Sequence, residues 1–250
     1  ASMSESSTPA TSAQSASSDQ RSVVKAAGII GIGTFASRIL GFIRDMVMAG
    51  LFGATAAADA FYVAFRVPSL LRELFAEGSM SAAFIPVFTE YHQQKTKREA
   101  WELASAVFTT LLTIVTGTVL IGIAVTPAIV WYLAPGFHGD PDKLTLAVVL
   151  SRVMFPYLLF ISLAALAMGI LNSLRAFAVP AFSPLFLNVF MIGCALFLSP
   201  QLPEPIIGVA IGVVAGGAAQ FVMQLPGLAR RGFLDRKSTR LNSSHVKRSR

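Results

Sequence analysis

The chain has 250 residues, of which 54% are hydrophobic and 13% are charged, and its mean hydropathy is +0.65. These values exclude a soluble globular domain and indicate an all-α polytopic membrane protein. The formal net charge of +7 would suit a nucleic-acid partner, but the distribution of that charge along the chain argues against one.

The segment Asp235–Arg250 accounts for most of the excess charge. It carries six basic residues and one acidic residue, and its sequence DRKSTRLNSSH looks like the translation of a common sequencing-library adapter. Without it, 14 basic and 12 acidic residues remain, a net charge of +2, so we expect no nucleic-acid partner. We interpret residues 232–250 as a non-native or disordered basic tail and leave them out of the fold. The alternative is a natural basic cytoplasmic tail.

The N-terminal segment Ala1–Gln20 consists largely of Ser, Thr, Ala and Gln without an apolar period. It is therefore expected to be disordered, and it lacks the pattern of a signal peptide. A membrane-spanning helix needs about 20 apolar residues. By this criterion residues 21–231 form a six-helix transmembrane unit, with predicted helices at Val23–Leu51, Ala57–Phe75, Ala104–Leu133, Val153–Leu174, Ala176–Pro203 and Pro205–Ala229.

The Lys and Arg residues in the short connections predict the orientation, because cytoplasmic loops carry an excess of them. One set of segments contains Arg21, Lys25, Lys95, Lys97, Arg98, Arg175, Arg230 and Arg231. The alternate set, at 50–56, 135–143 and 199–204, contains only Lys143. Six alternating helices with a cytoplasmic N-terminus satisfy this asymmetry.

The stretch Ser37–Tyr91 is apolar enough to lie in a membrane, yet it is rich in charge. Its charged residues include Arg38, Arg44, Asp45, Asp59, Arg66, Arg72, Glu73 and Glu77. Each charge at bilayer depth costs about 2.5–3.5 kcal/mol on insertion scales, so such residues usually line a watery cavity or pair with one another. This stretch is the candidate functional site.

Helical spacing groups these charges into two stripes. Arg38 and Asp45 are seven residues apart and share a helix face, while Asp59, Arg66 and Glu73 repeat at the same interval. The two charged stripes can therefore face each other across a cavity. The alternative is internal ion pairing, as Arg44–Asp45, Arg66–Asp59 and Arg72–Glu73, which would only hold helices together.

Several motifs in one order resemble the MurJ (MviN) family of lipid II flippases. They are SR-x-LGF-x-RD at Ser37–Asp45, ADAF at Ala58–Phe61, APGF at Ala134–Phe137, FPYLL at Phe155–Leu159, ILNS at Ile170–Ser173, PAFSPLFLNV at Pro180–Val189 and QLP at Gln224–Pro226. The resemblance covers roughly residues 23–231. It implies the N-terminal lobe of a MATE-like exporter of the MOP superfamily, which in this family has fourteen helices.

The resemblance also implies the substrate, an undecaprenyl-pyrophosphate-linked disaccharide pentapeptide (lipid II), moved from the inner to the outer leaflet by alternating access. Arg38, Arg44 and Arg72 match the family's headgroup-contacting arginines, and Asp59 and Glu77 match its acidic residues toward the outer and inner gates. Arginine suits this role because its planar fork binds phosphate bidentately. The implied partners are lipid II, membrane lipids and the missing C-terminal lobe, in the bacterial cytoplasmic membrane.

Two positions depart from the family pattern. Ser69 replaces a common Asn, and Glu73 replaces a frequent second Arg, so Glu73 is not carried over as a phosphate ligand. Together with Asp45 and Arg66, these two residues are secondary cavity candidates. Since the resemblance reaches only the N-terminal lobe, a truncated reading frame is expected.

Other functions remain as alternatives. Another MOP-type transporter could export a polyprenyl-linked oligosaccharide or a drug, although an exporter of drug cations would need net negative charge in its cavity. An intramembrane glycosyltransferase would need a sizeable extramembrane loop with an acidic motif, and a non-transporting scaffold would only bind partners. The sequence has no metal-ligand cluster and no phosphate-binding loop, so we expect no enzyme activity, metal or nucleotide cofactor.

Overall fold

The computed structural model describes residues 9–74 and 84–232. In these two ranges the secondary structure is helical and contains no strand. The elements are α1 Pro9–Phe52, α2 Ala56–Arg72, α3 Ile85–Gln94, α4 Lys97–Leu133, η2 Pro135–Phe137, α5 Pro141–Met154, α6 Pro156–Ser173, α7 Ala178–Gly193, η3 Cys194–Leu198, η4 Ser199–Gln201, α8 Pro205–Val222 and α9 Leu225–Ala229. The prediction of an all-α polytopic membrane protein is confirmed.

The number of full-length spans differs from the six predicted. Five helical stretches in the described part are long and apolar enough to cross a membrane: Ala27–Phe52, Lys97–Leu133, Pro141–Ser173, Ala178–Gln201 and Pro205–Ala229. The α-helical part of the other predicted span, α2 (Ala56–Arg72), has 17 residues, about 25 Å at 1.5 Å per residue, which is shorter than the roughly 30 Å hydrocarbon core. π-Helical geometry follows at Glu73 and Leu74, where the first described range ends. The third stretch, formed by α5 and α6, starts earlier than predicted because Asp140 caps the backbone N–H of Lys143.

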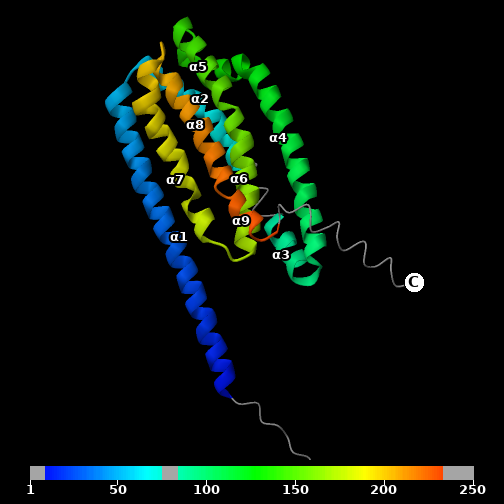
Figure 1. The fold of residues 1–250 in the computed structure, drawn as a ribbon. Coiled ribbons are helices and arrows are strands. Elements are labelled where there is room, and N and C mark those ends of the chain that lie inside the picture. The colour runs from blue at the N-terminus through cyan, green and yellow to red at the C-terminus, as the bar shows by residue number, and fades with distance from the viewer. Residues whose placement is uncertain (1–8, 75–83, 233–250) are drawn as a thin grey trace, which may run out of the picture.

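Although short, α2 belongs to the interior of the bundle. Ala60, Phe61 and Ala64 on α2 are buried, and they join the same apolar cluster as Leu150 and Met154 on α5. Figure 1 shows the α1–α2 turn at one end of the bundle and α3 at the other. The chain therefore passes between the two ends in the segment that contains α2.

The N-terminal region also differs from expectation. We predicted disorder for residues 1–20, but α1 begins at Pro9 and runs for 44 residues, about 66 Å. Its N-terminal half projects past the other helices in Figure 1. Adding a residue to an existing helix is easier than nucleating one, so α1 can extend backwards from its apolar span without an apolar period. Residues 1–8 and 233–250 lie outside the described part, and the predicted limits of the tails remain predictions.

Close helix packing fixes α1 in the bundle. The main partner of α1 is α7, whereas α2 packs mainly on α5. A Cβ atom added to Gly33 of α1 would lie 2.5 Å from the carbonyl oxygen of Ala181 on α7. Small residues allow such close approach between membrane helices. The packing of α1 on α7 thus depends on the absence of a side chain at Gly33.

The connections alternate between the two ends of the bundle. The turns around residues 53, 138 and 202 lie at one end, and α3, the 174–177 turn and α9 lie at the other (Figure 1). The second end carries the Lys- and Arg-rich connections of the sequence. This alternation agrees with the predicted loop sets.

Candidate functional site

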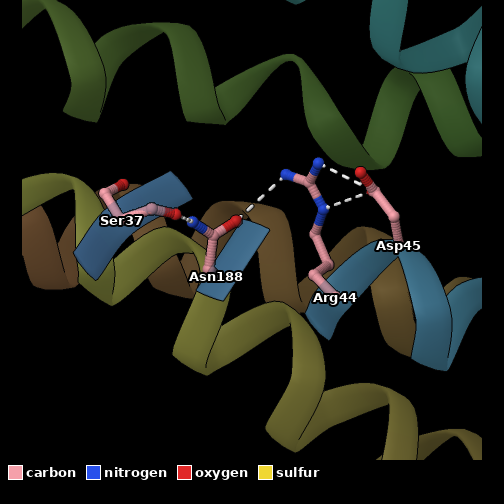
Figure 2. A network of polar contacts seen from close by, with 4 residues as sticks. All are labelled: Ser37, Arg44, Asp45 and Asn188. Carbon is pink, nitrogen blue, oxygen red and sulfur yellow. Dashed lines mark hydrogen bonds and ion pairs between the residues drawn. The ribbon is translucent and has the colours of Figure 1, made fainter. Parts of the chain in front are cut away.

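Arg44 on α1 has a well-defined set of partners. Its Nε and Nη2 atoms donate to Oδ1 of Asp45 at 3.0 and 2.8 Å, and its Nη1 atom donates to Oδ1 of Asn188 at 3.0 Å (Figure 2). A guanidinium has five N–H donors, so three are engaged and two remain, one on each terminal nitrogen. Two donors in a planar fork match two oxygens of a phosphate group. The predicted alternative pair Arg44–Asp45 forms, yet Arg44 still has donors for a ligand.

Asn188 was not among the predicted site residues, although it lies in the matched segment Pro180–Val189. It is only 6% exposed on α7, and its Nδ2 atom donates to the carbonyl oxygen of Ser37 on α1 at 3.3 Å. Asn188 and Arg44 are 144 residues apart in the sequence, so no local spacing connects them. The available signal was an amide side chain in the middle of a largely apolar span, which is a reason to suspect function in a membrane protein.

Asp59 pairs across the bundle rather than along its own helix. Its Oδ2 atom lies 2.6 Å from Nζ of Lys143 in the first turn of α5. The ammonium of Lys143 also lies 4.4 Å from the ring centroid of Phe137. The alternative Arg66–Asp59 pair is therefore wrong. Residues seven apart on a helix are about 10 Å apart along its axis, whereas ion pairs on one helix form at spacings of three or four.

The remaining predicted residues lie on α1 and α2 or directly after α2. Arg38 and Arg66 are exposed, and neither makes a hydrogen bond or ion pair within residues 9–74 and 84–232. At the end of α2, Arg72 is half-buried and has an interaction partner. Ser69 is half-buried and Glu73 is exposed, while Glu77 lies outside the described residues. The structure thus places Arg44 and Asp45 in contact, whereas the other described candidates lie at separate positions along α1 and α2.

The charged residues of α1 and α2 lie on open faces of the described part. Since α1 packs mainly on α7 and α2 mainly on α5, the two predicted stripes do not pack on each other. A cavity of about 230 Å³ lies instead between α4, α6, α8 and α9, where Trp101, Leu163 and Phe221 are among its uncharged lining residues. This apolar cavity is separate from the predicted cationic one, which residues 9–74 and 84–232 do not enclose.

Comparisons with known proteins agree on one family. The model of the family described as "Lipid II flippase MurJ" matches residues 48–249. A relative from Vibrio cholerae serotype O1 is 45% identical over 221 residues, covering 86% of this chain and 42% of the relative. A lipid II flippase MurJ from Burkholderia cenocepacia is 43% identical over 197 residues, covering 79% of this chain and 38% of the relative.

A solved structure shares the fold as well. It is a lipid II flippase MurJ in an inward closed conformation, with a TM-score of 0.67 and 31% sequence identity over 80% of this chain and 42% of that chain. The chain therefore spans about 40% of the length of the curated relatives it matches. The family match includes residues 232–249 of the segment 232–250, which the sequence suggested to be a non-native or disordered tail, and that interpretation stays a prediction. The chain is a multi-pass bacterial membrane protein, and it belongs to the lipid II flippase MurJ family.

Proposed function

We propose that this chain forms the N-terminal lobe of a transporter that flips lipid II, the undecaprenyl-pyrophosphate-linked disaccharide pentapeptide, from the inner to the outer leaflet. The observation that carries the proposal is the arrangement at Arg44. This arginine is held on the side of a membrane helix with two N–H donors still available, in a chain that belongs to the lipid II flippase MurJ family. A diphosphate headgroup supplies the acceptor oxygens that such a fork requires.

Arg38, Arg44 and Arg72 are the proposed ligands of the pyrophosphate. Arg38 is exposed and Arg72 half-buried, so both can reach a ligand beside α1 and α2. The headgroup would bind these cations while the lipid tail stays in the bilayer. A second lobe would supply the opposite wall of the cavity and alternate its opening between the two sides of the membrane.

The acidic candidates have a different proposed role. Asp59 lies near the α1–α2 turn, at the end that we place outside, and Glu77 comes after α2 in the sequence. Both are proposed gating residues, and Asp45, Arg66, Ser69 and Glu73 are proposed to border the cavity. The Lys and Arg content of the connections supports a cytoplasmic N-terminus. A transporter with this mechanism needs no catalytic residue of its own.

The test uses residues 1–231 of this chain followed by the part of the Vibrio cholerae relative that the chain does not match. Arg38, Arg44 and Arg72 are each changed to Ala in a flippase-depleted bacterium, and outer-leaflet exposure of labelled lipid II is measured separately from membrane abundance. Each lost charge-assisted hydrogen bond is worth about 1.5–3 kcal/mol, so headgroup capture should weaken about ten- to hundredfold.

Arg152→Ala is the matched control. Arg152 is an exposed arginine on α5 whose Nε donates to the carbonyl oxygen of Ile123 on α4. It is not one of the proposed ligands, so its loss should leave flipping intact. Normal flipping and normal abundance in all three ligand variants would refute the proposed cationic site. An exporter of organic cations would show the opposite response, because removing positive charge should then preserve or improve transport.

A further inference from the structure

Asn188 bridges two points on α1 that are two helical turns apart. Its Oδ1 atom accepts a hydrogen bond from Nη1 of Arg44 at 3.0 Å, and its Nδ2 atom donates to the carbonyl oxygen of Ser37 at 3.3 Å (Figure 2). Arginine can only donate and a carbonyl can only accept, so this is the one orientation of the amide that satisfies both contacts. Both ends of the Asn188 side chain are therefore committed to α1.

The Asn188 side chain lies beside Gly41 of α1, at a distance that would leave only ordinary van der Waals contact with an added Cβ atom. A Cβ atom added to Gly41, which lies between Ser37 and Arg44 on α1, would lie 3.8 Å from Nδ2 of Asn188. The preceding and following residues on α7, Leu187 and Val189, are apolar. Helix packing alone would be served by an apolar side chain here, since a polar group inside a membrane is costly unless it is bonded. The hydrogen bonds of Asn188, rather than helix packing, therefore account for an asparagine at this position.

Asn188 is the partner of Arg44 that comes from another helix. Asp45 also binds Arg44, but it is the next residue on the same helix and its side chain is 57% exposed. A contact from α7 instead fixes the guanidinium relative to the bundle. Ordering a long side chain before the ligand arrives reduces the conformational entropy lost on binding.

We propose that Asn188 is a positioning residue, which orients Arg44 so that its two remaining donors are presented to a diphosphate group. This inference rests on the proposed function of Arg44 as a headgroup ligand. Asn188 itself touches no ligand in this scheme, because it is only 6% exposed and its bonds from Oδ1 and Nδ2 are made to α1. Its effect on ligand binding must therefore pass through Arg44.

The experiment measures both the restraint and its consequence in the full 250-residue chain, purified into lipid nanodiscs. The restraint is followed as the rate at which phenylglyoxal modifies Arg44, resolved by peptide mass spectrometry with Arg152 as internal reference. The consequence is followed as the affinity for undecaprenyl pyrophosphate. The variants are Asn188→Ala, Arg44→Ala and the double variant. Ser183→Ala is the matched control, because Ser183 is a buried polar residue on α7 whose Oγ donates to the carbonyl oxygen of Gln220 on α8.

Asn188→Ala should raise the modification rate of Arg44 and weaken undecaprenyl pyrophosphate binding about three- to tenfold, as expected for one net hydrogen bond. In the Arg44→Ala background the same change should have no further effect on binding. Asn188→Asp serves as a second variant should the alanine variant not fold. It keeps an acceptor for Arg44, so modification should stay slow, while its negative charge should weaken diphosphate binding.

The possible failures are distinguishable. An unchanged Arg44 modification rate in Asn188→Ala would overturn the proposed restraint. A faster modification rate with unchanged affinity, or a loss of affinity that persists in the Arg44→Ala background, would overturn the positioning role but leave Arg44 as a ligand. Unchanged affinity in Arg44→Ala itself would overturn the proposed function, and with it the role of Asn188 in that function.

Discussion

The close contact of α1 with α7 leads to a test in which alanine substitutions at two glycines on one helix should differ in their effect on stability. A Cβ added at Gly33 would lie 2.5 Å from the carbonyl oxygen and 2.8 Å from the carbonyl carbon of Ala181, whereas a Cβ added at Gly31 meets no atom within 4 Å. Alanine is favoured over glycine inside a helix by about 0.8–1.0 kcal/mol. Gly31→Ala should therefore stabilise the protein slightly.

Gly33→Ala gains the same helix propensity but must push α1 away from α7. The clashing atoms belong to backbone, which cannot rotate aside, and such overpacking costs about 1–3 kcal/mol. We expect the net effect of Gly33→Ala to range from neutral to about 2 kcal/mol destabilising, and its difference from Gly31→Ala to be about 1–3 kcal/mol. The displacement should also loosen the contact between Asn188 and Ser37, which lies one turn along α1 from Gly33.

The assay compares thermal unfolding of the two variants in the same detergent, together with phenylglyoxal modification of Arg44. For a protein of this size, 1 kcal/mol corresponds to roughly 2–4 °C. Gly33→Ala should unfold at a lower temperature than Gly31→Ala and should expose Arg44 to faster modification. Equal unfolding temperatures and equal modification rates would refute the described packing of α1 on α7.

Two further predictions concern the ends of the bundle. Because Asp59 is 59% exposed, its pair with Lys143 contributes at most about 1 kcal/mol to stability. Asp59→Asn should therefore lower the unfolding temperature by no more than about 4 °C, and adding Lys143→Met to that variant should lower it little further. Fully additive losses would show that the two residues do not interact. For the orientation, single cysteines at Gly139 and Lys95 in a Cys194→Ser background should react differently with an impermeant thiol reagent in whole cells. Labelling is expected at position 139, and labelling at 95 alone would invert the orientation.

The sequence was sufficient to predict the helices because uncharged apolar runs leave few alternatives in a membrane. Ala104–Leu133 and Pro205–Ala229 were predicted on this basis, and both lie in observed spans. The α2 region was harder to delimit because its charges interrupt the hydropathy. The α-helix begins at Ala56 and gives way to π-helical geometry after Arg72, and the predicted end at Phe75 lies outside the described residues. Apolar runs also do not predict helix starts that are set by capping residues such as Asp140.

The candidate site was predictable where its contacts are local. Arg44 and Asp45 are adjacent in sequence, so their pairing could be anticipated. The partners Lys143 for Asp59 and Asn188 for Arg44 are 84 and 144 residues away, and they depend on which helices pack together. Composition and helical spacing contain no information about that choice. Sequence reasoning could therefore propose the charged residues of the candidate site but not the distant residues that contact them.

These contacts suggest different proposed roles for the arginines of α1 and α2. Asp45 offsets the charge of Arg44, so that pair contributes little net attraction for an anion at a distance. Arg38 and Arg66 are exposed and have no ion-pair partner in residues 9–74 and 84–232, so their charge is not offset within this part of the chain. Long-range attraction falls with ionic strength, whereas a bidentate contact depends mainly on geometry. Arg38 and Arg66 are therefore suited to drawing a diphosphate toward the helices, and Arg44, fixed between Asp45 and Asn188, is suited to orienting it.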